Sequence, residues 1–178
     1  MNDVATRPQA FETARLRLRP LEAADAPQLA ALANDFDVVR MTGSMPYPFT
    51  PADAEGMVRR GQVADAETEV MFAIDLPGEG AIGTIGFDPD GALADEVGYW
   101  LGRPYWGRGY ATEALAASLA WVRDQWGRRC ITARHFADNP ASGAVLIKAG
   151  FLYTGRTEMR PCKARGHAVL TRWMVWLA

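Results

Sequence analysis

Two glycines flank an arginine at positions 107–109, directly before a segment with the pattern of an amphipathic helix. Glycine has no Cβ, so its backbone turns tightly and lets its N–H group approach a ligand closely. The first turn of a helix adds N–H donors without partners and a partial positive charge. These features predict an anion site at Arg108 to Thr112, and we interpret the anion as a diphosphate.

Two common nucleotide-binding motifs are absent from this stretch. The Gly-x-Gly is followed by Tyr110, Ala111 and Thr112, without the third glycine or alanine of the dinucleotide fingerprint. No Gly-Lys-Ser or Gly-Lys-Thr occurs in the sequence, which excludes a P-loop. A glycine pair before a helix can also serve the geometry of the turn alone.

A strand and a helix must hold this loop. Residues 95–101 alternate as a strand does, with Val97, Tyr99 and Leu101 on one face and Glu96, Gly98 and Trp100 on the other. The following segment carries an apolar stripe at spacings of four, three and four, formed by Leu115, Leu119, Val122 and Trp126. A strand, the glycine loop and a long helix therefore follow one another directly.

The longer string WGRGYA, from Trp106 to Ala111, resembles the pyrophosphate loop of the GNAT superfamily of acyl-CoA-dependent N-acetyltransferases. That loop runs Gln/Arg-x-x-Gly-x-Gly/Ala, so Gly109 and Ala111 match while Trp106 stands at the Gln/Arg position. GYWLGRPYWGRGYATEAL is similar to the branch of the RimJ and RimL ribosomal-protein N-acetyltransferases, which commonly carry tryptophan there. The resemblance covers about residues 95–160.

The resemblance implies an α/β (α+β) fold, with a mixed, mostly antiparallel sheet of about six or seven strands and about four flanking helices. We expect one domain over residues 1–178, with 1–12 as a loose tail. The remaining pattern predicts strands at residues 13–21, 69–75, 81–87, 130–136, 152–159 and 168–177, a turn at 88–92, and helices that begin at Asp25 and Thr50, the second ending at Gly61.

The resemblance also implies acetyl-CoA as co-substrate and no metal. Two strands splay apart in this fold, so backbone groups near Trp100 and Leu101 are expected to bind the pantetheine arm and the thioester oxygen. The other expected cofactor contacts lie in and beside the loop: Arg103, Gly107, Arg108, Gly109, Tyr110, Ala111 and Thr112.

A second informative string is DNPASGAVLIKAGF, residues 138–151. Asn139 as N-cap, Pro140 at the first helical position and Gly150 after the end predict a short helix with both ends specified. The spacing N-x-x-S…K-x-G-F resembles the next GNAT motif. By that resemblance Asn139 and Ser142 also bind the cofactor.

Acyl transfer to an amine needs a base for the amine, donors for the oxyanion and a proton or hydrogen bond for the leaving thiolate. By the resemblance Glu96, about ten residues before the loop, is the first candidate base. Glu158 is the competitor; each can also be a simple partner of an arginine. Family members with a tyrosine acid carry it four residues before the motif glycine, where this chain has Leu146. Ser142 fits the RimL-like alternative.

As the RimL-like alternative to a tyrosine acid, Ser142 hydrogen-bonds the sulfur of CoA. It can equally be an ordinary serine of a first helical turn. Tyr153 is a more distant alternative as acid.

The segment TGSMPYPFTP, residues 42–51, reads as a loop beside the acceptor. Met45, Tyr47 and Phe49 could wall an apolar slot for the substrate, as the corresponding region of the GNAT fold does. The alternative is that these three side chains pack onto the core.

Composition and charge limit the function classes. The net charge of −2 argues against a general nucleic-acid binder. Residues 1–100 hold 7 Lys and Arg against 17 Asp and Glu, whereas residues 101–178 hold 12 against 4. This asymmetry suits a phosphate-rich cofactor in the second half and a cationic amine near the first, although two solvated faces would give the same counts.

No signal peptide or membrane span is evident, and the two cysteines, without metal-site spacing, suggest free thiols, so we expect a cytoplasmic protein.

The sequence thus predicts an acetyl-CoA-dependent N-acetyltransferase that acts on a small-molecule amine or a protein N-terminus. The alternatives are an enzyme for a longer acyl-CoA and a non-catalytic CoA-binding sensor. A homodimer is one option, through exposed tryptophans such as Trp121 or Trp176. The identity of the acceptor amine is not readable from the sequence.

Overall fold

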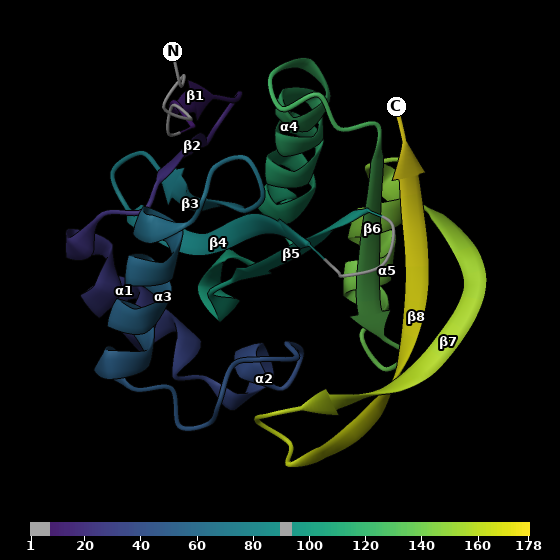
Figure 1. Ribbon diagram of the computed structural model, residues 1–178. Coiled ribbons are helices and arrows are strands. Elements are labelled where there is room, and N and C mark those ends of the chain that lie inside the picture. The colour runs from purple at the N-terminus through teal and green to yellow at the C-terminus, as the bar shows by residue number, and fades with distance from the viewer. Residues whose placement is uncertain (1–7, 90–93) are drawn as a thin grey trace.

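The computed structural model describes residues 8–89 and 94–178, and in these ranges one sheet of eight strands runs through the molecule. Its order is β1-β2-β3-β4-β5-β6-β8-β7 (Figure 1). The strands are β1 (Phe11–Glu12), β2 (Arg17–Pro20), β3 (Val70–Leu76), β4 (Gly80–Pro89), β5 (Asp95–Leu101), β6 (Cys130–Phe136), β7 (Leu152–Cys162) and β8 (His167–Leu177). All neighbouring pairs are antiparallel except β5 and β6, which confirms the predicted mixed, mostly antiparallel sheet.

The helices of the described ranges are α1 (Ala26–Ala33), α2 (Phe36–Val39), α3 (Pro51–Val63), α4 (Tyr110–Asp124) and α5 (Pro140–Lys148), with 3-10 turns η1 (Ala23–Asp25) and η2 (Arg103–Tyr105). Thr50 and Asp53 form a reciprocal capping box that starts α3, as predicted. Gly61 does not end α3, which is a correction. A Cβ there would lie 2.9 Å from Leu21 Cδ1, so this glycine serves close packing rather than helix termination.

The amino-terminal segment is more ordered than expected. Phe11 and Glu12 of the supposed tail form β1, which pairs with Leu18 and Arg17 of β2. Residues 1–7 lie outside the described ranges, as does most of the turn expected at 88–92.

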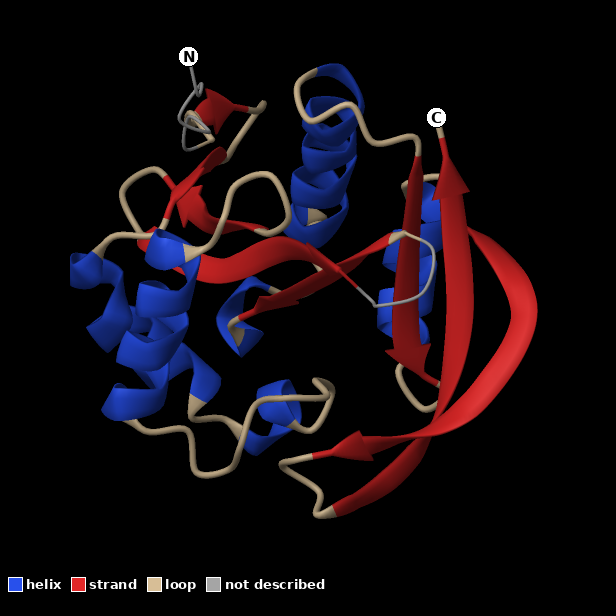
Figure 2. Ribbon diagram, viewed as in Figure 1, coloured by secondary structure: helices blue, strands red, loops and turns tan. Residues whose placement is uncertain are grey.

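Two hydrophobic cores lie on opposite faces of the sheet (Figure 2). One core joins the sheet to α4 and α5, and it contains Leu115, Leu119 and Leu146. The other joins the opposite face to α1 and α3. Successive side chains of a strand point to opposite faces, so β5 contributes Val97 and Leu101 to the first core and Trp100 to the second. The central strand therefore has access to both sides of the molecule.

The tryptophans suggested for a dimer surface are not free side chains. Trp121 packs against the rings of Phe11, Phe72 and Trp126, with centroid distances of 6.4, 5.1 and 6.1 Å. Trp176 is half-buried against the first core. Both residues stabilise the fold of a single copy, which corrects the expectation that they are exposed. None of the described helices is long and apolar enough to cross a membrane.

The pairing of β5 and β6 is short. Asp95, Glu96 and Val97 pair with residues 131–133 of β6, but β5 continues beside β4 as far as Leu101. Figure 1 shows the two strands diverging beyond this point. Residues 98–101 therefore present a strand edge that β6 does not cover, and we call this place the opening between β5 and β6.

Candidate active site

The glycine loop has a geometry that only glycine accommodates easily. Gly107 and Gly109 have φ values of 72° and 81°, in the left-handed region that disfavours other residues. Gly109 is the N-cap of α4. Within the described ranges, no amide N–H from Gly107 to Thr112 donates to a protein acceptor. A row of free donors at a helix start fits an anion, so the anion site at Arg108 to Thr112 stays a prediction with a suitable geometry.

Arg15, which the sequence patterns did not single out, holds this loop in place. Its Nη1 donates to the carbonyl of Arg108 at 2.9 Å, and its guanidinium lies 4.6 Å from the centroid of the Tyr110 ring. Nε and Nη2 both lie 2.7 Å from the carboxylate of Glu113. Because Arg15 comes almost a hundred residues earlier in the chain, no local motif could reveal this contact.

Glu113 completes that anchor. It accepts hydrogen bonds from Thr13 Oγ1 at 2.6 Å and from the Arg15 amide at 2.7 Å. Partial burial works to raise the pKa of Glu113, but the hydrogen bonds from Thr13 and Arg15 outweigh it and hold the pKa below its ordinary value.

Trp106 explains the departure from the usual loop motif. Its indole Nε1 donates to the carbonyl of Leu101 at 2.8 Å, so the side chain ties the loop to the end of β5. This bond occupies the Leu101 carbonyl. The Leu101 amide remains on the part of β5 that β6 does not cover.

Arg103 points away from the loop. Its Nη1 lies 3.4 Å from Asp37 and 3.7 Å from Asp35, both at the start of α2. The structure therefore places this predicted cofactor residue on the α2 side. Arg108 lies exposed in the loop.

The start of α5 lies beside the opening between β5 and β6. Asn139 Oδ1 accepts the Ser142 amide at 3.2 Å and so caps the helix. The Asn139 Nδ2 group donates to no protein acceptor in the described ranges. The hydroxyl of Tyr99, on β5, lies 3.0 Å from Ser142 Oγ. The structure thus brings Asn139 and Ser142 together with a tyrosine that the sequence patterns did not nominate.

The two candidate bases belong to one cluster, centred on Arg134 of β6. Arg134 Nε donates to Glu96 Oε1 at 2.7 Å, and its Nη2 contacts Glu96 Oε2. Its Nη1 lies 3.7 Å from Glu158 Oε1, and Arg156 Nη2 lies 2.9 Å from Glu158 Oε2. Trp173 supports the arginines, with guanidinium carbons 4.6 Å (Arg134) and 4.3 Å (Arg156) from its ring centroid.

A third carboxylate, Asp88, pairs with Glu96 across β4 and β5. Burial raises the pKa of Asp88, against the opposing charge of Arg60. Asp88, Glu96 and Glu158 come from β4, β5 and β7, and each of these carboxylates is paired with an arginine. No three His, Cys, Asp or Glu side chains among the described residues are grouped so as to hold a metal ion.

Gly98 lies between Glu96 and Trp100 on β5 and leaves open space beside the strand. It lies on the same face of β5 as Glu96 and Trp100, and it is the first residue of β5 beyond the pairing with β6. A Cβ added there would have no neighbour within 4 Å, and the residue is exposed although its strand is central in the sheet. Space for a ligand therefore exists directly above Gly98.

The three residues predicted to line a substrate slot, Met45, Tyr47 and Phe49, lie in different environments. Met45 and Phe49 are 5% and 4% exposed and belong to the second core, so they pack as the structural alternative expected. Tyr47 is 51% exposed, and its ring meets that of Phe36 at a centroid distance of 5.2 Å. Of the three, only Tyr47 has a largely exposed side chain.

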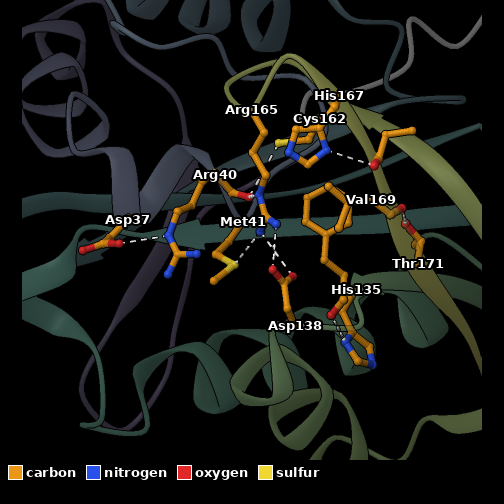
Figure 3. Close-up of polar contacts among 12 residues, drawn as sticks. Asp37, Arg40, Met41, His135, Asp138, Cys162, Arg165, His167, Val169 and Thr171 are labelled. Carbon is orange, nitrogen blue, oxygen red and sulfur yellow. Dashed lines mark hydrogen bonds and ion pairs between the residues drawn. The ribbon is translucent and has the colours of Figure 1, made fainter.

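Arg165 connects the residues after α2 to Asp138, directly before the start of α5 (Figure 3). From the turn between β7 and β8, its Nε donates to the carbonyl of Arg40 at 2.7 Å and its Nη1 lies 2.6 Å from Asp138 Oδ2. Lys163 N donates to the carbonyl of Gly43 at 3.0 Å. The β7–β8 turn, the segment after α2 and the residue before Asn139 are thus joined.

Comparisons with known proteins agree on one family. A family model described as an acetyltransferase (GNAT) domain matches residues 15–152. The uncharacterized N-acetyltransferase p20 of Bacillus licheniformis is 31% identical over 157 residues, covering 80% of this chain and 82% of that protein. The uncharacterized N-acetyltransferase YoaA of Bacillus subtilis (strain 168) is 29% identical over 161 residues, with 82% and 84% covered.

Solved structures show the same fold. RimJ of Mycobacterium smegmatis, in complex with CoA-disulfide, superimposes with a TM-score of 0.82 at 24% identity. The match covers 96% of this chain and 88% of that one.

Proposed function

The chain belongs to the GNAT acetyltransferase family, and from this premise we propose that it transfers an acetyl group from acetyl-CoA to a primary amine. The transfer is direct, with both substrates bound together. The observation that carries the proposal is the row of free amides from Gly107 to Thr112, beside the opening between β5 and β6. These donors fit the diphosphate of CoA.

The two faces of the sheet have different tasks in this proposal. On the α4 side, the loop binds the diphosphate and Asn139 Nδ2 donates to an amide oxygen of the pantetheine arm. The uncovered edge of β5 supplies backbone donors, near Trp100 and Leu101, for the thioester oxygen. On the opposite face, the acceptor amine lies above Gly98.

The carboxylates near Arg134 prepare the amine. A protonated amine must lose a proton before its lone pair can attack the thioester carbon. Glu96 or Glu158 takes that proton, directly or through water, while Arg134 keeps both carboxylates in place. Ser142 then donates a hydrogen bond to the sulfur as the C–S bond breaks.

The direct test is thiol release from acetyl-CoA with a panel of small amines and peptide N-termini. We expect turnover with at least one acceptor and none without an amine. Binding of acetyl-CoA without turnover on any amine would favour the non-catalytic sensor. Faster turnover with a longer acyl-CoA would favour that alternative, and the best acceptor of the panel decides between small amine and protein N-terminus.

A further inference from the structure

The tyrosine hydroxyl nearest to Ser142 comes from the central strand rather than from α5. In α5 the position four residues before Gly150 is Leu146, which is fully buried in the core. Tyr99 of β5 instead packs against that core and reaches the first turn of α5. Its hydroxyl lies 3.0 Å from Ser142 Oγ and 3.2 Å from the Ser142 carbonyl oxygen.

Ser142 is otherwise fixed only through its main chain. Its amide donates to Asn139 Oδ1, and within the described ranges the side-chain oxygen Oγ contacts the hydroxyl of Tyr99. A serine hydroxyl carries one hydrogen and accepts others. The single hydrogen of the Tyr99 hydroxyl can go to Ser142 Oγ or to the Ser142 carbonyl oxygen, which can only accept. When it goes to Oγ, the hydrogen of Ser142 is free for another acceptor; when it goes to the carbonyl, Ser142 Oγ donates to Tyr99 and its hydrogen is not free.

We propose that Tyr99 is a positioning residue: it donates to Ser142 Oγ and so directs the Ser142 hydrogen to the sulfur of CoA. The inference rests on the proposed function, because it assumes that the sulfur lies beside Ser142. The C–N bond forms, the C–S bond breaks and its electron pair goes to the sulfur. Both hydroxyls keep their protons, since each donates a hydrogen bond only.

The surroundings of Tyr99 support a neutral donor. Burial raises its pKa to about 12, so the phenol stays protonated throughout the physiological pH range. Tyr99 also lies two residues beyond the last pair between β5 and β6, which places its side chain at the opening itself. A phenylalanine would keep the packing there and lose only the hydroxyl.

The first test measures binding, so it does not depend on turnover. CoA and desulfo-CoA are titrated by calorimetry from about pH 7 to about pH 10, a range over which a growing fraction of the CoA thiol is ionised. We expect the parent protein to prefer CoA about tenfold, and Tyr99→Phe and Ser142→Ala each to lose that preference. A Tyr99→Phe protein that keeps the full preference would overturn the inference.

The second test is a double-mutant cycle on kcat. Tyr99→Phe and Ser142→Ala should each lower kcat about tenfold with less than twofold change in KM for acetyl-CoA, and the double variant should fall no further. Multiplicative losses would contradict the proposal.

The matched comparison is Tyr153→Phe. The Tyr153 hydroxyl also lies under α5, but it donates to His135 Nε2 at 2.9 Å, because His135 Nδ1 donates to the Phe136 carbonyl. The loss of kcat in Tyr153→Phe should therefore be independent of Ser142, so that the double variant with Ser142→Ala shows the product of the two single losses.

Two outcomes separate this inference from the proposed function. A sulfur preference that depends on Tyr99, without turnover on any amine, supports the positioning role and refutes the enzyme. Turnover in which Tyr99→Phe and Ser142→Ala have independent effects supports the enzyme and refutes the positioning role of Tyr99. If Tyr99→Phe fails to fold, replacing Tyr99 by 3,5-difluorotyrosine keeps the donor and acidifies it. The kcat of that protein should then fall at alkaline pH, where the parent's does not, and an unchanged profile contradicts the inference.

Discussion

Arg134 changes how the two candidate bases must be understood. Glu96 and Glu158 were alternatives in the sequence, yet both lie beside the same guanidinium. Glu96 has both oxygens engaged by Arg134, whereas the nearest partner of Glu158 is the exposed Arg156. A carboxylate in a bidentate contact is well oriented but must share its lone pairs with the arginine.

Glu96→Gln is expected to lower kcat about a hundredfold or more, the usual contribution of a general base, with little change in acetyl-CoA affinity. The loss should be largest near neutral pH, where the amine is mostly protonated. The pH–rate profile and a calorimetric titration measure the two effects. Glu158→Gln is the matched variant, and a parent-like pH profile in either variant eliminates that residue as base.

Gly98→Val should close the acceptor side while leaving the cofactor side intact. The new side chain would occupy the open space above β5, so we expect kcat/KM for the amine to fall at least tenfold and acetyl-CoA affinity to change less than twofold. A valine suits a strand, so the fold should persist. Unchanged amine kinetics would show that the acceptor does not bind above Gly98.

At the scale of elements, the proposed function makes cofactor binding depend on the start of α4. Gly109→Glu should abolish measurable CoA binding by calorimetry, because a carboxylate and its side chain would compete with the diphosphate. Gly127, beyond the other end of α4, has a similar φ of 71° and serves as the matched control. Gly127→Glu introduces the same strain and charge, and its CoA affinity should stay near that of the parent. Retained affinity in Gly109→Glu would refute the placement.

The anchor of that helix start has a predictable pH dependence. The pKa of Glu113 is lowered in the folded state, so its ionised form contributes stability that is present above the ordinary pKa, about 4.3, and lost as the pH falls through the folded value. Glu113→Gln should therefore cost roughly 1–2 kcal/mol at pH 7, and the difference from the parent should shrink in acid.

Urea unfolding at pH 7 and at about pH 3 checks this. A difference that is the same at both pH values would mean that the carboxylate charge does not stabilise the fold.

At the scale of the whole molecule, contacts between distant segments join the β7–β8 turn to the residues after α2. Figure 1 shows the β7–β8 turn beside α2, although these two segments are far apart in the sequence. Arg165 joins these segments to Asp138, and it holds the pKa of Asp138 below its usual range. Arg165 therefore supports both the residues after α2 and the start of α5.

Arg165→Ala should loosen that support. We expect a loss of roughly 2 kcal/mol, a fall in Tm of about 4–8 °C, and faster hydrogen exchange at residues 40–43. KM for the amine should rise more than the dissociation constant of acetyl-CoA. Arg123→Ala is the control, because among the residues that the structure describes Arg123 pairs only with its exposed neighbour Asp124. Equal effects of the two variants would show that the Arg165 contacts do not stabilise the acceptor side.

Local chemistry in the sequence was enough to determine the elements that carry the cofactor loop. Three features act within a few residues of the chain: the alternation of residues 95–101, the glycines at 107 and 109, and the caps of α5. Each of them can therefore be predicted from the sequence alone. The family resemblance over residues 95–160 rested on these strings. Gly61 misled the prediction because its reason is a contact with Leu21, forty residues away.

Which side chains meet depends on the three-dimensional arrangement of the strands and helices. Tyr99 reaches Ser142, Arg15 reaches Glu113 and Arg165 reaches Asp138 across separations of 43, 98 and 27 residues. Such pairs depend on strand order, on register and on where β5 leaves β6, and these follow from packing both faces of one sheet at once. The sequence therefore indicated the glycine loop and the class of chemistry, whereas the grouping of carboxylates around Arg134 and the contact of Tyr99 with Ser142 exist only in the folded chain.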